Sequence, residues 1–571
     1  MLTPVKFAMA AATLSVVALP QAAIAASFSL INASVADINR AFEAGALTSE
    51  SLTQLYLNRI DAYEGQLNNF VSLNPDALET ARLLDLERQT SGPRSLLHGI
   101  PVLLKDNIDT FDLPTTAGSV ALAGSIAPDD AFITAQLRDA GAIILGKASL
   151  TEFANFLTSG MPAGYSSLNG YTFNPYNPFP LEGGDGRPAL SPGGSSAGSG
   201  AAVAASLTPL SVGTETSGSI LSPANQNSVV GIKPTVGLIS RDGIIPIAAS
   251  QDTAGPFGKT VADAATLLGF LTGVDPSDPA SAASEGKFFT DYTQFLDKDA
   301  LAGARIGVPQ TQYWNGLAAD QIGILEDAIA TIESLGAEII FEDIPNQEAV
   351  NELGFSVLVY EFKRDLNAYL ASLGPDAPVK NLAEIIDFNE ANADVALKYG
   401  QVLAELSQEV DLSPFSEDTL EYLEARLADL RVAKEEGIDN YIDTFDLDAV
   451  LFPANRGAGI AAKSGYPSVI VPAGYLDSGA PYGVTFSGVA FSEPELIGFA
   501  YAYEQASQKR VAPGLFPALA GEDFEYESVP EPGMMPALVV LGGALLGYRT
   551  RKRQSITAVK TPMAGASMMG R

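Results

Sequence analysis

The sequence contains no cysteine and only one histidine, His98. Without cysteine the chain cannot form a disulfide, a thiolate zinc site or an iron–sulfur cluster. A lone histidine argues against a histidine-rich metal centre; a carboxylate-bound calcium or magnesium ion stays open, although no EF-hand-like loop is present. We therefore expect neither a metal nor a cofactor. A serine nucleophile in this chain would have at most one histidine available as its base.

Basic residues are also scarce. The chain has 33 lysines and arginines against 67 acidic residues, which gives a formal net charge of −34. Such a surface repels phosphate backbones, so we expect no nucleic-acid partner. The acidity favours solubility; the alternative is a role in attracting cationic substrates. Hydrophobic residues make up 47% and charged residues 18% of the 571 positions, a composition typical of a globular protein with a large core.

The first 26 residues have the three parts of a signal peptide. Lys6 supplies the basic start, an apolar stretch follows from Phe7 to Leu19, and residues 23–25 (Ala-Ile-Ala) form a small-residue cleavage signature. An internal helix is the alternative interpretation. The pattern predicts a protein exported to the periplasm, the cell envelope or the outside of the cell, with a mature domain at about 27–525.

The C-terminal end has the pattern of a second targeting signal. Residues 530–533 (Pro-Glu-Pro-Gly) precede a fifteen-residue apolar run, 534–548, which four basic residues follow: Arg549, Arg551, Lys552 and Arg553. The run is shorter than the roughly 20 residues of a membrane-spanning helix, and the basic flank favours a stop-transfer or sorting segment. Residues 529–553 resemble a PEP-CTERM sorting signal, which implies processing by an exosortase. A membrane anchor is the alternative, and 554–571 form a basic tail.

Between these ends, helical and strand-like apolar patterns alternate. Residues 51–70 have helical spacing, and 130–150 predict a helix, a stop at Gly141 and a short strand. Further strands are predicted at 99–104, 210–213, 304–308, 338–341, 449–452 and 468–471. The alternation predicts an α/β fold with a mixed central β-sheet sheathed by helices. The helix-rich, acidic stretch from about 315 to 440 is predicted to form a cap, and 179–190 is a turn-rich insertion.

Residues 191–223 concentrate serine, glycine and other small residues, and they are the candidates for chemistry. Ser195 and Ser196 lie in a Gly-Gly-Ser-Ser loop that enters a helix, and Ser219 lies in a second glycine-containing turn. A serine nucleophile needs a nearby base and N–H donors for the developing oxyanion. Lys105 ends a buried strand, where burial favours its neutral, proton-accepting form. On composition alone, such loops are more often simple turns.

Several separated motifs identify a family. The runs GGSSAGS (193–199) and GTETSGSI (213–220), and the lysine run GIPVLLKDNID (99–109), resemble the signature of the amidase signature family. The two serines lie 24 positions apart, as they do in that family. The resemblance continues through 227–265, 465–475 and 490–507, and it covers about residues 30–515.

This resemblance implies a Ser-Ser-Lys mechanism. Ser219 would attack the substrate carbonyl, and Ser195, which the family holds in a cis peptide, would relay the proton to Lys105. The oxyanion hole would be formed by the backbone N–H groups of Thr216, Ser217, Gly218 and Ser219. Such a relay returns a proton to the leaving amine, which must be protonated before the C–N bond breaks.

The chain also departs from the family pattern. Glu215 stands where aspartate is commoner, Ser217 where glycine or aspartate is usual, and Leu221 where many relatives have arginine. These changes leave the three catalytic groups in place and are expected to alter the acyl pocket. The runs 361–370 and 382–394 resemble the peptide amidase branch, which implies carboxylic or peptide C-terminal amides as substrates.

Other interpretations stay open at this point. An esterase would use the same nucleophile, an amidotransferase subunit would share the family, and a non-catalytic envelope-binding protein would share the fold. A Ser-His-acid triad through His98 is formally possible, because chain order does not decide a triad. Lys105 is alternatively a buried ion-pair lysine, with Asp106 as its neighbour.

Overall fold

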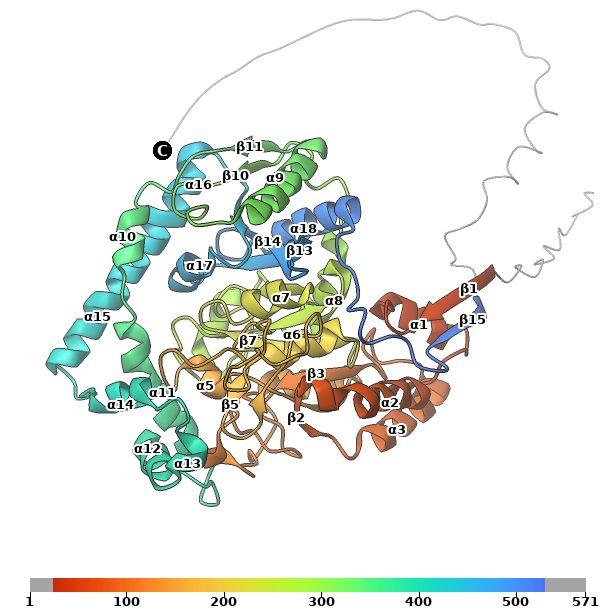
Figure 1. Ribbon diagram of the computed structural model, residues 1–571, viewed down its shortest axis with the longest axis horizontal. Coiled ribbons are helices and arrows are strands. Elements are labelled where there is room, and N and C mark those ends of the chain that lie inside the picture. Colours follow the sequence, from red (N-terminus) through yellow and green to blue (C-terminus); the bar gives the residue numbers. More distant parts are fainter. Residues whose placement is uncertain (1–23, 529–571) are drawn as a thin grey trace, which may run out of the picture. The chain divides into compact units, whose positions relative to one another are not determined.

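The computed structural model describes residues 24–528 (Figure 1). Most of the predicted signal peptide (1–26), the sorting segment (529–553) and the basic tail (554–571) lie outside these residues. Strand β1 (Ile24–Ser29) includes the last residues of the predicted leader, and it pairs with β15 (Asp523–Ser528). Of the helices within 24–528, none is both long and apolar enough to cross a bilayer.

An eleven-stranded sheet forms the centre of the body, in the order β11-β10-β12-β14-β13-β8-β9-β7-β3-β4-β2. Its strands are β2 (Phe70–Leu73), β3 (Pro101–Lys105), β4 (Ile143–Ala148), β7 (Leu210–Glu215), β8 (Val230–Lys233), β9 (Thr253–Gly258), β10 (Arg305–Gly307), β11 (Glu338–Ile340), β12 (Ala449–Pro453), β13 (Ser468–Tyr475) and β14 (Pro481–Ser487). Strand β3 runs parallel to β4 and β7, whereas β7 and β9 are antiparallel. The predicted mixed sheet is therefore confirmed.

Helices cover both faces of this sheet. They are α1 (Val35–Glu43), α2 (Ser49–Leu67), α3 (Ala77–Ser91), α4 (Phe132–Asp139), α6 (Ala197–Ala204), α7 (Leu221–Asn227), α8 (Val261–Leu271), α9 (Ala319–Ser334), α17 (Ala458–Ser464) and α18 (Glu493–Ser507). Local sequence sets their ends: at α2, the side chain of Thr48 accepts from Ser51 N–H and the Ser51 side chain accepts from Thr48 N–H, a reciprocal cap.

Small residues let α6 approach its neighbours closely. A Cβ atom on Gly198 would lie 2.4 Å from the backbone oxygen of Asn69 and 2.7 Å from Ser149. Only glycine fits at such a distance. The helix therefore packs against the loop after β4 and holds the serine loop at its N-terminus against the sheet.

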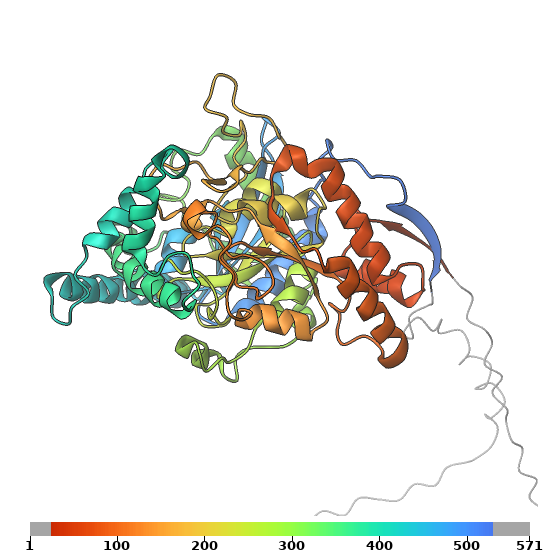
Figure 2. The same cartoon turned by 90° about the horizontal axis from the view of Figure 1, so that it is seen from below.

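The cap consists of helices inserted between β11 and β12. They are α10 (Gln347–Glu352), α11 (Ser356–Ser372), α12 (Leu382–Ala391), α13 (Ala393–Ala396), α14 (Val402–Glu409), α15 (Glu417–Asp429), the π-helical segment Leu430–Asp439 and α16 (Asn440–Phe445). Helices α11 to α14 lie at the opposite end of the body from α2 and α3 in both views (Figure 1, Figure 2). The predicted cap range of about 315–440 also includes α9 and β11, but β11 is the edge strand of the sheet.

The cap has an apolar core of its own. Phe362, Leu366 and Ile385 from α11 and α12 pack against Phe153 and Leu157 from the segment after β4. The main core instead follows the sheet and its flanking helices. Helices α11, α12 and α14 therefore pack against the segment after β4, whereas the π-helical segment and α16 share an apolar cluster with Val450 and Phe452 of β12.

Candidate active site

Lys105 is the last residue of β3, and its side chain is fully buried. Its Nζ lies 2.8 Å from Ser195 Oγ, 2.8 Å from Thr214 Oγ1 and 3.2 Å from the backbone oxygen of Thr214. A neutral amine has two N–H groups and one lone pair. With both N–H groups donated to the two oxygens of Thr214, the lone pair is left for the hydroxyl hydrogen of Ser195.

The surroundings of Lys105 favour that neutral form. Burial lowers the pKa of Lys105 to about 7, against the opposing effect of the Asp252 and Glu215 carboxylates. Asp106, the neighbour considered as its ion-pair partner, instead lies 3.9 Å from the Nζ of Lys147. A lysine with its pKa near neutrality is suited to act as a general base.

The first serine loop carries two hydroxyls with different surroundings. The Gly194–Ser195 peptide bond is cis, and the Ser195 hydroxyl faces Lys105. Ser196 Oγ donates to the backbone oxygen of Thr214 (3.0 Å) and accepts from its N–H (3.2 Å), and Ser196 N–H donates to the backbone oxygen of Ser219 (3.2 Å). Ser196 therefore joins the two serine loops, while Ser195 is placed for proton transfer.

Ser219 lies in a tight turn between β7 and α7. Its side chain is 7% exposed, and Gly218 before it has φ +82°, a conformation that favours glycine. Among the hydrogen bonds of residues 24–528, none uses the backbone N–H of Ser217, Gly218 or Ser219 as donor. These groups are thus available to a substrate oxygen, as an oxyanion hole requires.

Glu215 and Asp252 accept hydrogen bonds from this turn and from the start of α7. Glu215 Oε2 accepts from the N–H groups of Ile220 (2.7 Å) and Leu221 (2.9 Å). Asp252 Oδ1 accepts from the Thr216 hydroxyl at 2.5 Å. In this structure the longer Glu215 side chain reaches the backbone just beyond Ser219.

Sequence reasoning missed three polar groups of the site. Asp252 is buried, and burial raises its pKa to about 7. Thr214 contacts Lys105 directly, and Asn107 Nδ2 donates to Thr214 Oγ1 at 3.0 Å. All three lie inside the motif runs that were recognised, but only the sheet register shows that they meet.

His98 lies elsewhere. Its ring is buried; Nε2 lies 2.9 Å from the backbone oxygen of Leu84, and Nδ1 accepts from the Arg94 N–H at 3.2 Å. Both ring nitrogens are therefore occupied by the backbone, so His98 is not the partner of Ser219. In the described part of the chain, His, Asp and Glu side chains form no cluster of three suited to hold a metal.

Comparisons with known proteins identify the family of the chain. A family model described as Amidase matches residues 51–459. The structure is similar to that of the peptide amidase from Stenotrophomonas maltophilia, with a TM-score of 0.79, 42% sequence identity and coverage of 84% of this chain and 98% of that one. A probable amidase of Arabidopsis thaliana is 41% identical over 510 residues, which cover 88% of this chain and 95% of that protein.

A third relative represents another branch. A glutamyl-tRNA(Gln) amidotransferase subunit of Marinobacter nauticus is 32% identical over 500 residues, which cover 83% of this chain and 98% of that protein. The family model spans both serine loops and the lysine strand, and the relatives match most of the sequence. The chain belongs to the amidase family and is an amide-hydrolysing enzyme.

Proposed function

We propose that the protein is an exported amidase that hydrolyses carboxylic amides, including peptide C-terminal amides, through an acyl-enzyme on Ser219. The observation that carries the proposal is the 2.8 Å contact between Lys105 Nζ and Ser195 Oγ, beside the turn that holds Ser219. The similarity to a peptide amidase supports the substrate class.

The first half of the reaction forms the acyl-enzyme. Lys105 takes the hydroxyl proton of Ser195, and Ser195 takes that of Ser219. The Ser219 oxygen then attacks the carbonyl carbon. The N–H groups of the 216–219 turn stabilise the oxyanion of the tetrahedral intermediate, and each such donor contributes on the order of 100- to 1,000-fold in rate.

The second half returns the proton. The Lys105 ammonium group donates to Ser195, and Ser195 donates to the leaving nitrogen as the C–N bond breaks. Water then attacks the acyl carbon while its proton passes through Ser195 to Lys105. That proton returns through Ser195 to the Ser219 oxygen as the ester C–O bond breaks, and the carboxylic acid is released. The relay ends with Lys105 neutral, so no external acid or base is consumed within a cycle.

Labelling with a fluorophosphonate tests the nucleophile. We expect one covalent adduct on the wild-type protein, none on Ser219→Ala, and an unchanged adduct on Ser222→Ala, whose serine lies in the same loop region at the start of α7. Absence of labelling in folded wild-type protein would instead favour a non-catalytic binding protein.

A matched pair of substrates tests the bond that is cleaved. We expect turnover of both an acyl amide and the corresponding ester, because the same nucleophile serves both. An esterase would hydrolyse the ester and leave the amide essentially intact. The amidotransferase role is disfavoured by the net charge of −34, which opposes contact with tRNA.

Export is part of the proposal and rests on residues 1–26 and 529–553. Fractionation of cells that express the full chain, with mass spectrometry of the mature ends, tests it. We expect an envelope or extracellular protein whose N-terminus begins near residue 27 and whose tail has been processed by an exosortase-type enzyme. An intact, cytoplasmic chain would contradict export and would revive the amidotransferase interpretation.

A further inference from the structure

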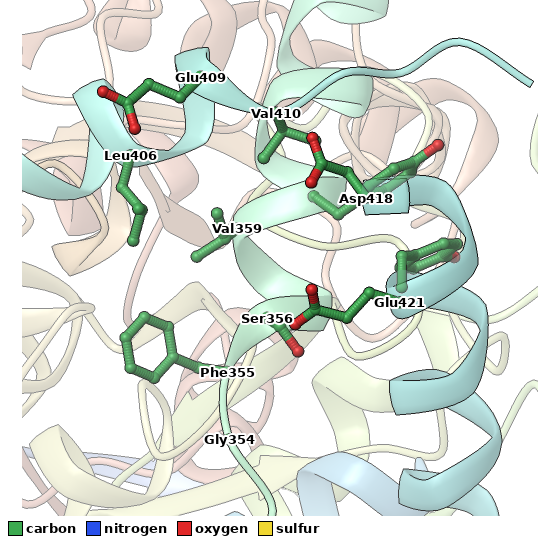
Figure 3. Close-up of a pocket in the computed structure, with 11 residues that line it drawn as sticks. Gly354, Phe355, Ser356, Val359, Leu406, Glu409, Val410, Asp418 and Glu421 are labelled. Atoms are coloured by element: carbon green, nitrogen blue, oxygen red, sulfur yellow. The ribbon is translucent and has the colours of Figure 1, made fainter. Parts of the chain in front are cut away.

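A pocket of about 670 Å³ lies in the cap, between α11, α14 and α15 (Figure 3). We call it the cap pocket. Phe355, Val359 and Leu406 supply its apolar lining, and Phe355 is 52% exposed. The mechanism derived above does not use any of these residues. An open, partly apolar cavity of this size is large enough for a long side chain.

Three carboxylates line the same pocket. They belong to Glu409, Asp418 and Glu421; Figure 3 shows Glu421 reaching from α15 towards Ser356 on α11. Within residues 24–528, no ion pair includes any of the three. The cap pocket therefore has an uncompensated negative charge.

Three cations beside the pocket are already engaged by other groups, and one of them, Lys463, pairs with Asp429 at 2.9 Å. Lys363 Nζ donates to the backbone oxygens of Gln408 and Val410, each at 2.7 Å. Arg364 pairs with Asp365 at 2.6 Å and with Glu361 at 3.2 Å. None of the three forms an ion pair with a carboxylate of the pocket.

An aromatic wall completes the lining. The rings of Tyr360 and Tyr422 stack with their centroids 4.2 Å apart and their planes at 7°, and both residues line the pocket. The guanidinium group of Arg364 already lies over these rings, 5.5 Å from the Tyr422 centroid and 6.0 Å from that of Tyr360. The aliphatic part of a bound lysine or arginine would pack on the apolar lining, while its charged end reaches the carboxylates. This combination favours a cationic side chain over an anionic or a purely apolar group.

Helix α17 is the first of two connections between the cap pocket and the catalytic turn. At its end, Lys463 donates to the backbone oxygen of Gly354, which lines the pocket, over 2.8 Å. At the start of α17, the Cβ of Ala458 lies 3.6 Å from the position that a Cβ atom on Gly218 would take. Since α17 (Ala458–Ser464) rises about 1.5 Å per residue and the Lys463 side chain extends beyond it, the edge of the pocket at Gly354 lies within about 20 Å of the catalytic turn. An extended peptide of about six residues spans that distance.

The second connection is a path of hydrogen bonds. Tyr422 donates to Glu361 Oε1 at 2.7 Å, and Glu361 Oε2 accepts from the Ser250 N–H at 2.9 Å. Ser250 is two residues before Asp252, which holds Thr216 of the catalytic turn. The wall of the pocket and the nucleophile turn are thus supported by one continuous set of groups.

We propose that the cap pocket is a subsite for a lysine or arginine side chain of an extended peptide amide whose C-terminal amide is held at Ser219. The inference rests on the proposed function and adds a preference for cationic peptides. The basic residue lies several positions before the amide, because the pocket is separated from the catalytic turn by the length of α17.

A positional series of peptide amides tests the subsite. The peptides share one neutral C-terminal residue and an alanine background, with a single lysine placed from one to seven residues before the amide. We expect kcat/KM to peak with lysine three to six residues upstream, about tenfold above the peptide with norleucine there. Added salt should reduce the peak, because exposed charges are screened.

Charge-neutral variants sharpen the test. The double variant Glu409→Gln/Glu421→Gln should lose the lysine peak and keep its rate on a short acyl amide that cannot reach the pocket. Glu417→Gln, on α15 but outside the pocket lining, should keep the peak. Retention of the short-amide rate shows that the double variant is folded.

The outcomes separate the two proposals. Hydrolysis of every peptide at rates independent of charge would overturn the subsite and leave the amidase function intact. A lysine preference that survives in the double variant would also overturn it and assign the preference to the acidic surface as a whole. No hydrolysis of any amide would overturn both.

Discussion

Strands β3 and β7 differ from the cap in how much of their surface is exposed. Every residue of β3 and β7 is buried, and the polar groups near Ser219 are held by short hydrogen bonds. In the cap, Phe415 is 88% and Leu427 66% exposed. A site that moves protons needs fixed positions, and a surface that selects substrates needs accessible apolar and charged groups. The proposed reaction and the proposed selection of substrates therefore use separate parts of one chain.

The two regions meet at the loop before β9. Asp252 accepts from the N–H groups of Ile247 and Ala248, each at 2.8 Å, and Asp365 of the cap accepts from Ala249 at 3.0 Å. Glu361, also of the cap, accepts from Ser250. Carboxylates from both regions therefore hold one loop, and this loop supports the oxyanion turn.

The largest expected difference comes from replacing one lysine in each region. Lys105→Met should lower kcat/KM for amides on the order of 1,000-fold, because it removes the proposed base. Lys398→Met, in the cap, should change it less than about twofold, since Lys398 lies over tyrosine rings at the surface. Steady-state kinetics with a short amide and circular dichroism of both variants check this. Substantial activity in Lys105→Met would show that another base acts.

The pH dependence is the next largest effect. With the pKa of Lys105 near 7, the amine is protonated and inactive at lower pH. We therefore expect kcat/KM to rise about tenfold per pH unit up to about 7 and then level off. A flat profile from pH 5 to 9 would contradict the relay.

The lowered pKa of Lys105 also affects the stability of the folded state. An unfolded lysine keeps its proton up to about pH 10.4, so between pH 7 and 10 the unfolded state binds more protons than the folded state at Lys105. Stability from this group therefore rises with pH in that window. Lys105→Met should raise the Tm at pH 7 by more than at pH 10, as thermal melts at both values would show.

Replacing two glycines that have the same backbone conformation is expected to give a smaller difference in kcat. Gly218 has φ +82° and Gly374, between α11 and α12, has φ +81°. Alanine at either position adopts a conformation that costs about 1–2 kcal/mol, so both variants should lose a similar amount of stability. Only Gly218→Ala should also lower kcat, by about tenfold, because it shifts oxyanion donors. Equal kcat values in both variants would argue against the proposed hole.

The smallest effect concerns the insertion at 179–190. Its Asp185 accepts from the Tyr399 hydroxyl, which also contacts the Tyr171 hydroxyl, and Lys398 donates to the Asp185 backbone at 3.2 Å. Tyr399→Phe should cost about 1 kcal/mol or less and leave the rate on short amides within about twofold. Limited proteolysis should cut the insertion faster in this variant. Unchanged cleavage would show that the contact does not hold the insertion.

Strands with continuous apolar runs were predictable, and others were not. The run at 99–104 corresponds to β3, and those at 449–452 and 468–471 correspond to β12 and β13. Strands β8 and β9 were missed because glycine, proline and lysine interrupt their short apolar pattern. These residues are accommodated because the two strands pair with each other and with β13 and β7, and such long-range pairing overrides local propensity.

Sequence alone determined the fold class, the family and the candidate residues Lys105, Ser195 and Ser219, because each lies in a local pattern. Only the tertiary structure decided that Lys105 meets Ser195 and Thr214, that His98 is occupied by backbone groups, and that Asp252 supports the turn. These contacts join residues up to 109 positions apart; the pairing of β3 with β7 brings Lys105 to Thr214, and the pairing of β9 with β7 brings Asp252 to Thr216. The charge and shape of the cap pocket likewise arise only where three helices pack together, since none of them contains the pocket by itself.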